Sequence, residues 1–549
     1  IRASDGSNLS DEHRNSINLH FKEMKSTLIQ TSLQVVIFLT VLSLDAQTLD
    51  LKVKWGQEFK TPRSTLNDVV GHDATGFYAV HNRFRAFGKV EYSLQHFDKS
   101  MNPGRTADLD IESGKRSGRI SNILHLKGKL LLFYSLDDSK AKVNSLFLDE
   151  IDKQTLQPKG EVKKIGEIDY AGKSKRNRGS FQYRVSRDSS KILLLYSLPY
   201  TEGQPEKFGF TVFDQQLNLI WTKDITMPYR DELYDFESFR VDNNGNAYLL
   251  GLVYKEKRKE KRKGLPNYSY EILACRDNGN TVKQYPVSLD DRFLTDMQIE
   301  ILDDQNIVCA GFYSEKGTVS IRGTFFLRVD AASSAIVHKS FKEFGIDFIT
   351  QNMSNREQRK AKRQEEPELF EFDLDKLLVG KDGSAILIGE QYYVQAITNT
   401  MRMPGGGMTT QTTYHYYYND IILVKFSATG EILWTQKIPK TQHTANDGGF
   451  YSSYCLVISK GRICFVFNDN PKNLEADETE KAKNYNPRKS VVVLVSVDQA
   501  GNVTKQPVFN ALDAEVIVRP KACKQISNGE VIVYGQRKKT QQFASLVIL

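Results

Sequence analysis

Short apolar runs, each followed by a turn, recur along almost the whole chain. Typical runs are 247–250, 307–310, 463–466 and 531–534, all rich in Val, Ile, Leu, Phe and Tyr. A turn of one kind follows seven such runs, at 97–100, 151–154, 213–216, 276–279, 329–332, 426–429 and 497–500. Most of these turns contain Asp, whose side chain can bond the backbone of its own turn, and some contain Gly, which tolerates positive φ. The pattern predicts seven copies of one β-hairpin.

A second kind of turn precedes each hairpin and separates a mixed strand from a very apolar one. It is clearest at 242–245, 381–383 and 460–461, and weaker at 73–76, 127–128, 188–190 and 303–305. An eighth copy at 527–529 has no turn of the first kind after it, and the sequence ends on the third strand of this last unit.

The missing fourth strand is expected near the start of the apolar repeats. Trp55, Trp221 and Trp434 lie in one shared local pattern, and the strands around Trp221 and Trp434 are the fourth of their units. The strand around Trp55 is then also a fourth strand, with no unit before it. It should complete the C-terminal unit.

Sharing one sheet between distant segments resembles the closure of β-propellers, in which radial repetition leaves only short, protected edges. The sequence therefore predicts an all-β fold and a single β-propeller of eight four-stranded blades, or seven if the first or second repeat is miscounted. Residues 48–549 are similar to secreted bacterial β-propellers in general. The segment 186–193 resembles the Ser-Pro-Asp-Gly-Lys turn of TolB-type blades, with Arg and Ser in place of Pro and Gly.

The segment 24–46 is typical of a secretory signal peptide. Met24 and Lys25 precede an uncharged, largely apolar run at 26–44, and small residues follow it. We expect cleavage after Ala46, and residues 1–23 are interpreted as a spurious or disordered extension. The mature chain, 47–549, should be periplasmic or secreted, without a further membrane span.

Composition adds few chemical signals. The net charge is +8, and much of the excess lies in the segment 255–263, which lacks the interleaved aromatic residues of nucleic-acid binders. The five cysteines are scattered in apolar runs and are expected to be buried thiols, with Cys455 and Cys464 the one pair that could be bridged. No spacing of His or Cys indicates a metal site, and no Gly-rich phosphate loop is present, so neither a metal nor a cofactor is expected.

The long insertions should share one face of the disc. They span 255–267, 341–369, 391–419 and 468–488, and three lie within blades between the second and third strands, while 341–369 links two blades. Long loops on a rigid scaffold favour a binding face, although insertions can also be merely tolerated there. The insertion 391–419 carries Tyr414, Tyr416, Tyr417 and Tyr418, for which recognition and edge packing both remain open.

A set of polar residues is expected at the mouth of the central channel. Counting back eight positions from the turn glycine of the innermost strands gives Asp68, Ile120, Glu237, Asp375, Ser453 and Lys521. The carboxylates and Lys521 could perform acid–base chemistry or bind a cation or sugar, or they could only line a wet channel.

Together these features predict an exported binding or scaffolding module with a protein or glycan partner on the loop-rich face, rather than an enzyme. The alternative is a propeller hydrolase or lyase that acts on a saccharide or peptide through the channel carboxylates. Neither the ligand nor the oligomeric state follows from the sequence.

Overall fold

The computed structural model describes residues 48–549 except 61–63, 86–89, 114–115, 175–176, 290, 334, 365–366, 403–405, 477–479 and 488. The expected signal peptide and its cleavage site at Ala46 lie outside the described residues. The chain divides into the units Ile1–Leu49 and Asp50–Leu549, and the second is described here. Among the residues that the structure describes, no helix has the length and apolarity needed to cross a membrane.

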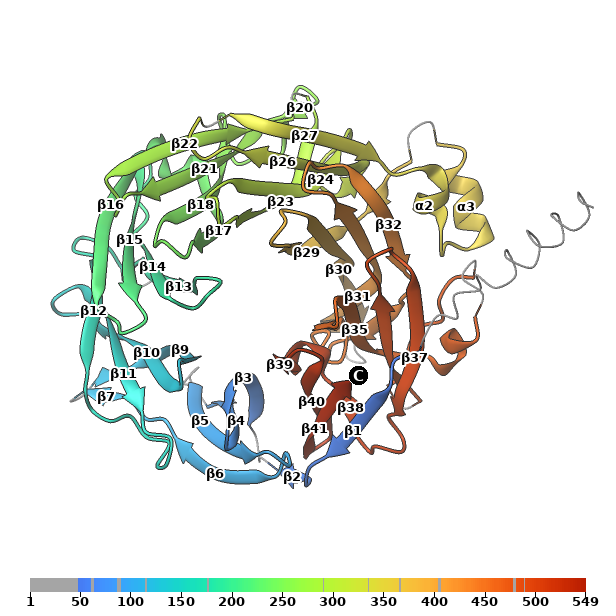
Figure 1. Cartoon of the computed structure of the whole chain (residues 1–549), viewed down its shortest axis with the longest axis horizontal. Coiled ribbons are helices and arrows are strands. Elements are labelled where there is room, and N and C mark those ends of the chain that lie inside the picture. Colours follow the sequence, from blue (N-terminus) through green and yellow to red (C-terminus); the bar gives the residue numbers. More distant parts are fainter. Residues whose placement is uncertain are drawn as a thin grey trace, which may run out of the picture. The chain divides into compact units, whose positions relative to one another are not determined.

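The unit is all-β and propeller-like. Its described residues form eight antiparallel sheets of four or more strands. Figure 1 shows them arranged radially, and in the seven sheets built from consecutive segments of the chain the first strand lies toward the centre. Seven sheets are, in chain order, β3 (Thr65–Asp73), β4 (Gly76–Phe84), β5 (Val90–Asp98) and β6 (Pro103–Asp108); β9 (Arg119–Leu126), β10 (Lys129–Asp138), β11 (Val143–Ile151) and β12 (Lys163–Asp169); β13 (Ser180–Val185), β14 (Lys191–Ser197), β15 (Pro205–Asp214) and β16 (Leu219–Arg230); β17 (Tyr234–Val241), β18 (Ala247–Tyr254), β21 (Tyr268–Arg276) and β22 (Thr281–Val287); β23 (Phe293–Ile301), β24 (Ile307–Ser314), β26 (Gly323–Val329) and β27 (Ile336–Glu343); β29 (Phe372–Val379), β30 (Ala385–Arg402), β31 (Met408–Phe426) and β32 (Ile432–Ile438); and β34 (Cys455–Ser459), β35 (Arg462–Asp469), β36 (Val491–Val497) and β37 (Val503–Asn510).

The last sheet joins the two ends of the unit, as predicted. Its C-terminal strands are β38 (Ile517–Val518), β39 (Lys524–Ser527), β40 (Glu530–Arg537) and β41 (Thr540–Ile548). Strand β1 (Leu51–Trp55) pairs antiparallel with β41, with Leu51 opposite Ile548 and Trp55 opposite Ala544, and β2 (Phe59–Lys60) pairs with the start of β41. The expectation that the strand around Trp55 completes this sheet is confirmed (Figure 1).

The core lies between neighbouring sheets, so the middle strands are apolar on both faces. All residues of β24 and β36 are buried, which explains their unbroken apolar runs. The predicted turns have the expected chemistry. In the turn before β18, Asp242 Oδ1 accepts bonds from the backbone N–H groups of Asn244 and Asn246 at 2.9 and 2.8 Å, and Gly245 has φ 88°.

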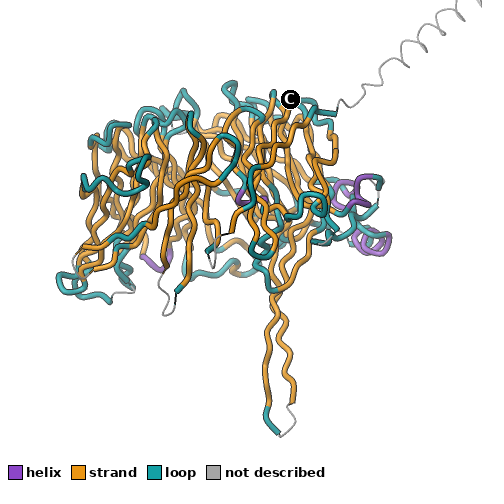
Figure 2. Tube along the Cα trace, turned by 90° about the horizontal axis from the view of Figure 1, so that it is seen from below, coloured by secondary structure: helices purple, strands orange, loops and turns teal. Residues whose placement is uncertain are grey.

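The insertions adopt four different structures. Residues 255–267 contain a small hairpin of β19 (Lys261–Arg262) and β20 (Leu265–Pro266), and 341–369 contain the helices α2 (Ile346–Thr350) and α3 (Asn355–Ala361). The third insertion lengthens β30 and β31 into a two-stranded hairpin that projects from the face opposite the C-terminus (Figure 2). The fourth includes the short 3-10 helix η3 (Pro471–Leu474).

Candidate functional site

The predicted channel residues lie on the innermost elements but do not form one cluster. Asp68 is on β3, Glu237 on β17 and Asp375 on β29, while Lys521 lies in the 3-10 helix η4 (Pro520–Ala522). Asp375 and Lys521 share a pocket of about 450 Å³, whereas Glu237 lines a different pocket of about 300 Å³. Asp68 lines neither, and burial raises the pKa of its carboxyl against the attraction of Lys524.

A β-bulge recurs on the innermost strands and explains which side chains point inward. Residues are skipped in the pairing of the innermost strands of six sheets; these residues are Asn67, Val70, Ser121, Glu237, Thr295, Asp375 and Ile526. A bulge re-aims the side chain of the strand that carries it. The side-chain directions of two of the predicted carboxylates, Glu237 and Asp375, are therefore determined by the same kind of β-bulge.

Asp296 was missed by the sequence analysis. It follows the bulged Thr295 and lines the same pocket as Glu237, and its Oδ2 accepts a bond from the Leu374 N–H at 3.0 Å. Burial, assisted by the charge of Glu237, raises the pKa of Asp296 to about 7. The count from turn glycines had no anchor on β23, because Gln305 (φ 64°) occupies the left-handed position of that turn.

Asp375 and Lys521 each contact a tyrosine. The Tyr454 hydroxyl donates to Asp375 Oδ2 at 2.6 Å, and burial, with repulsion from Glu390, raises the pKa of Asp375 to about 6. Lys521 Nζ lies 3.1 Å from the Tyr418 hydroxyl and 4.3 Å from the centre of its ring. The structure thus places Lys521 against Tyr418, and the sequence predicted these two residues independently of each other.

The four predicted tyrosines of β31 do not share one surface. Tyr418 is 4% exposed and Tyr414 is 47% exposed, so edge packing describes the first and only the second is freely accessible. Tyr417, on the other side of the strand, stacks between Tyr393 and His443 with ring centres 4.4 Å apart in both pairs. Tyr416 is half-buried and pairs with Thr444 across the strands.

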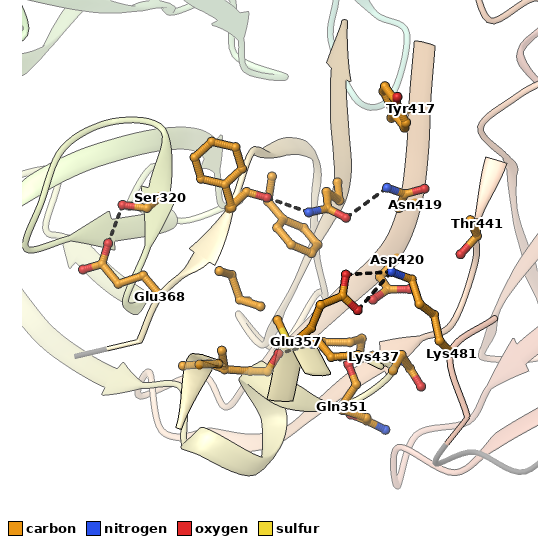
Figure 3. A pocket seen from close by; sticks show the side chains of 18 of the residues that line it. Ser320, Gln351, Glu357, Glu368, Tyr417, Asn419, Asp420, Lys437, Thr441 and Lys481 are labelled. Carbon is orange, nitrogen blue, oxygen red and sulfur yellow. Dashed lines mark hydrogen bonds and ion pairs between the residues drawn. The ribbon is translucent and has the colours of Figure 1, made fainter. Parts of the chain in front are cut away.

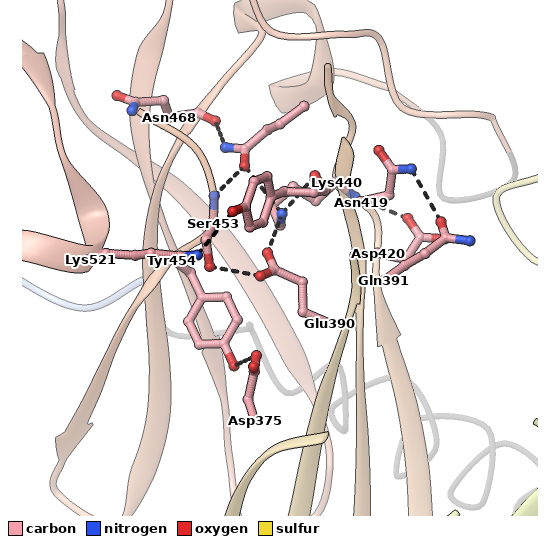
Figure 4. Close-up of polar contacts among 12 residues, drawn as sticks. Asp375, Glu390, Gln391, Asn419, Asp420, Lys440, Ser453, Tyr454, Asn468 and Lys521 are labelled. Atoms are coloured by element: carbon pink, nitrogen blue, oxygen red, sulfur yellow. Dashed lines mark hydrogen bonds and ion pairs between the residues drawn. The ribbon is translucent and has the colours of Figure 1, made fainter. Parts of the chain in front are cut away.

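A buried polar network connects these elements (Figure 4). Lys440 Nζ is fully buried and lies 2.6 Å from Glu390 Oε1 and 2.8 Å from the Tyr418 carbonyl oxygen. The other carboxylate oxygen of Glu390 accepts a bond from the Ser453 hydroxyl at 2.7 Å. Burial lowers the pKa of Lys440, while Glu390 opposes that shift. The network joins the base of the projecting hairpin to the next sheet.

Three of the four insertions meet around a pocket of about 910 Å³ (Figure 3). Its lining includes Asn352 beyond α2, Tyr393 and Tyr417 of the projecting hairpin, and Lys481. These residues belong to the insertions 341–369, 391–419 and 468–488. The insertion 255–267 contributes no residue to this lining.

Most charged groups of this pocket are already paired inside the protein. Lys481 Nζ contacts Glu357 Oε1 at 2.9 Å. Burial would raise the pKa of Glu357, but hydrogen bonds from Ser354 and Lys481 outweigh it and lower the pKa to about 2. Lys437 Nζ donates to the Phe348 carbonyl oxygen at 2.6 Å, and burial lowers the pKa of Lys437 to about 8.

Within the described ranges, no group of three or more His, Cys, Asp or Glu side chains could hold a metal ion. All five cysteines are free. Cys455 is in register with Val466 rather than Cys464, and its thiol lies against that of Cys523. The bridge between Cys455 and Cys464 that the sequence left open is therefore absent, and the cysteine that lies against Cys455 is Cys523, from the segment between β38 and β39.

No protein-family model and no curated protein matches the chain. Among solved structures, it is similar to the polysaccharide lyase Uly1 (10% identity, 78% of this chain and 90% of that one, TM-score 0.32). It is also similar to a variant of the Synechocystis apocarotenoid oxygenase (10% identity, 84% and 93%, TM-score 0.34) and to an acylaminoacyl peptidase of Pyrococcus horikoshii (10% identity, 86% and 58%, TM-score 0.34). Similarity at this level carries no argument about activity.

Proposed function

We propose that the protein is an exported recognition module built on an eight-bladed β-propeller, with β1 completing the last blade and the signal peptide removed after Ala46. The loop-rich face binds the partner, and the pocket of about 910 Å³ is the binding site on that face. One observation carries this proposal. Three insertions separated in sequence converge on one pocket, whereas merely tolerated loops would have no reason to meet.

The pocket can be blocked without touching its buried network. Ala361, the last residue of α3, lines the pocket and is only half-buried, so Ala361→Trp should fill space rather than disrupt the core. Ala332 is exposed in a tight turn and makes Ala332→Trp a matched control.

We expect immobilised wild-type protein and the Ala332→Trp variant to retain the same component of an extract from the source cell envelope. The Ala361→Trp variant should lose at least nine-tenths of it, measured by mass spectrometry and sugar analysis. Equal retention by all three proteins would show that the pocket is not the binding site.

A second candidate function is acid–base chemistry at Glu237 and Asp296. The observation that favours it is the raised pKa of Asp296, about 7, beside a second carboxylate, since a general acid needs to be protonated near neutral pH. An enzyme that uses Asp296 as its general acid would lose activity as the pH rises above the pKa of that residue, because the acid would then be deprotonated.

Activity on saccharide or peptide substrates should then fall above about pH 7 and drop by ~100-fold or more in Asp296→Asn. The recognition proposal expects no turnover in either protein and unchanged partner retention by Asp296→Asn. Assays of product release across pH 5–9 decide between the two functions.

A further inference from the structure

We propose that the pocket between α2, α3 and the projecting hairpin takes an uncharged saccharide, with Asn352 and Asn419 bonding its hydroxyl groups and Tyr393 packing against a sugar ring. This inference rests on the proposed recognition function and names the ligand class of the same pocket. It is carried by the polar groups that the protein leaves without partners there.

The side chain of Asn352 is the strongest indication. It is 5% exposed and lines the pocket, yet neither its amide nitrogen nor its oxygen has a hydrogen-bond partner among the described residues. A buried carboxamide without partners costs free energy comparable to a lost hydrogen bond. A bound ligand that offers both a donor and an acceptor would remove that cost, and a hydroxyl group offers both.

Asn419, on β31, is a second asparagine of this pocket that has a side-chain atom without a partner. Its Nδ2 donates to Gln391 Oε1 at 3.2 Å, which fixes the orientation of the carboxamide, and its Oδ1 is left without a partner. Both asparagines line the same pocket, Asn352 from just beyond α2 and Asn419 from β31. Figure 3 shows Asn419 in this pocket. Two neutral carboxamides suit hydroxyl groups better than they suit an ion.

The charged residues of the pocket also favour a neutral ligand. Lys481 is paired with Glu357, Lys440 with Glu390, and Lys437 with backbone carbonyl oxygens, so these ammonium groups are occupied within the protein. Glu368 accepts a bond from the Ser314 hydroxyl at 2.7 Å. A charged ligand that used Lys481, Lys440 or Lys437 would have to break these contacts, whereas a neutral polar ligand would not.

Tyr393 provides the apolar part of the site. Its ring stacks on Tyr417 at 4.4 Å and is the end of the row Tyr393–Tyr417–His443. The second face of the Tyr393 ring meets no further aromatic ring among the described residues, and Tyr393 lines the pocket. An aromatic ring that lines the pocket beside amide groups matches a pyranose ring, which has an apolar face and a rim of hydroxyls.

The test uses the chain from residue 47 on an array of immobilised neutral gluco-, manno-, galacto- and xylo-oligosaccharides, with polygalacturonate and hyaluronan as acidic saccharides. We expect retention on a neutral saccharide that weakens about tenfold in Asn352→Ala, the loss expected for one bond from a buried amide. Asn278→Ala is the matched control, because Asn278 is also at positive φ (56° against 65° for Asn352) but lies exposed in a tight turn. It should bind as the wild type does.

The results separate the two proposals. Binding only to acidic saccharides, or equal binding by Asn352→Ala and Asn278→Ala, would overturn the neutral-saccharide inference. If no saccharide binds but Ala361→Trp still abolishes retention of an envelope component, recognition through the pocket stands and the ligand class is wrong. If neither effect is seen, both proposals fail.

Discussion

A chain that begins at residue 61 instead of residue 48 is expected to lose roughly 5 kcal/mol or more of unfolding free energy, and to aggregate. The truncation removes β1 and β2, so the hydrogen bonds of Leu51–Trp55 to β41 are lost and one edge of β41 is exposed. It also removes Phe59, which is 9% exposed and packs on Phe97 and Phe543 with ring centres 5.1 and 5.7 Å away. An exposed sheet edge is a site for pairing with other chains.

A deletion of equal length elsewhere provides the control. Residues 399–402 and 408–411 of the projecting hairpin pair only with each other, so replacement of the segment 399–411 by Asn-Gly should leave the unfolding free energy within about 1 kcal/mol of the wild type. Urea unfolding and light scattering of the two shortened proteins would measure the contrast. If both deletions are tolerated equally, the shared last sheet contributes nothing to stability.

The strands and their turns could be predicted because each hairpin is a local feature. An Asp turn such as Asp242–Asn246 is held by bonds within five residues, so the sequence contains all the groups that specify it. The pairing of β1 with β41 spans almost the whole unit, yet it was also predictable, since the pattern around Trp55 repeats at Trp221 and Trp434.

The pocket could not be predicted in the same way. Glu357 and Lys481 are 124 residues apart, and neither has a sequence neighbour that indicates the other. Asp296 was missed because the turn after β23 has Gln305 in place of the glycine from which the count starts, and because the bulge at Thr295 also affects which side chains of that strand point inward. The insertions indicated segments that line the pocket, while the contacts between those segments depend on packing.

Lys440 is the clearest case of a residue whose buried position could not be predicted from the sequence. Lysine is almost never fully buried unless it is paired, so a sequence reading places it on the surface. Here its ammonium group lies inside, within bonding distance of Glu390, Gln442 and the Tyr418 carbonyl oxygen. Its environment is made by two strands and a loop, so only the folded chain reveals it.

The Glu390→Gln variant is expected to lose about 3–5 kcal/mol of unfolding free energy at pH 7, because it removes the carboxylate that forms the ion pair with the buried Lys440 ammonium. The exposed pair Lys159–Glu150 supplies the control, and Glu150→Gln should cost under about 1 kcal/mol. Urea unfolding of both variants measures the difference. Similar losses in the two variants would show that the buried pair contributes no more to the unfolding free energy than the Lys159–Glu150 pair does.

The pH dependence of the Glu390→Gln protein provides an independent check. Burial lowers the pKa of Lys440, and the loss of Glu390 removes the largest opposing influence, so the folded-state pKa falls further. Between that pKa and the unfolded value the unfolded chain binds more protons, so the unfolding free energy rises with pH. The deficit of Glu390→Gln should therefore shrink from pH 7 to pH 9, and the double variant Glu390→Gln with Lys440→Met should show no such recovery. A deficit that stays constant with pH would mean that the loss of Glu390 does not change how Lys440 is protonated between pH 7 and pH 9 in the folded protein.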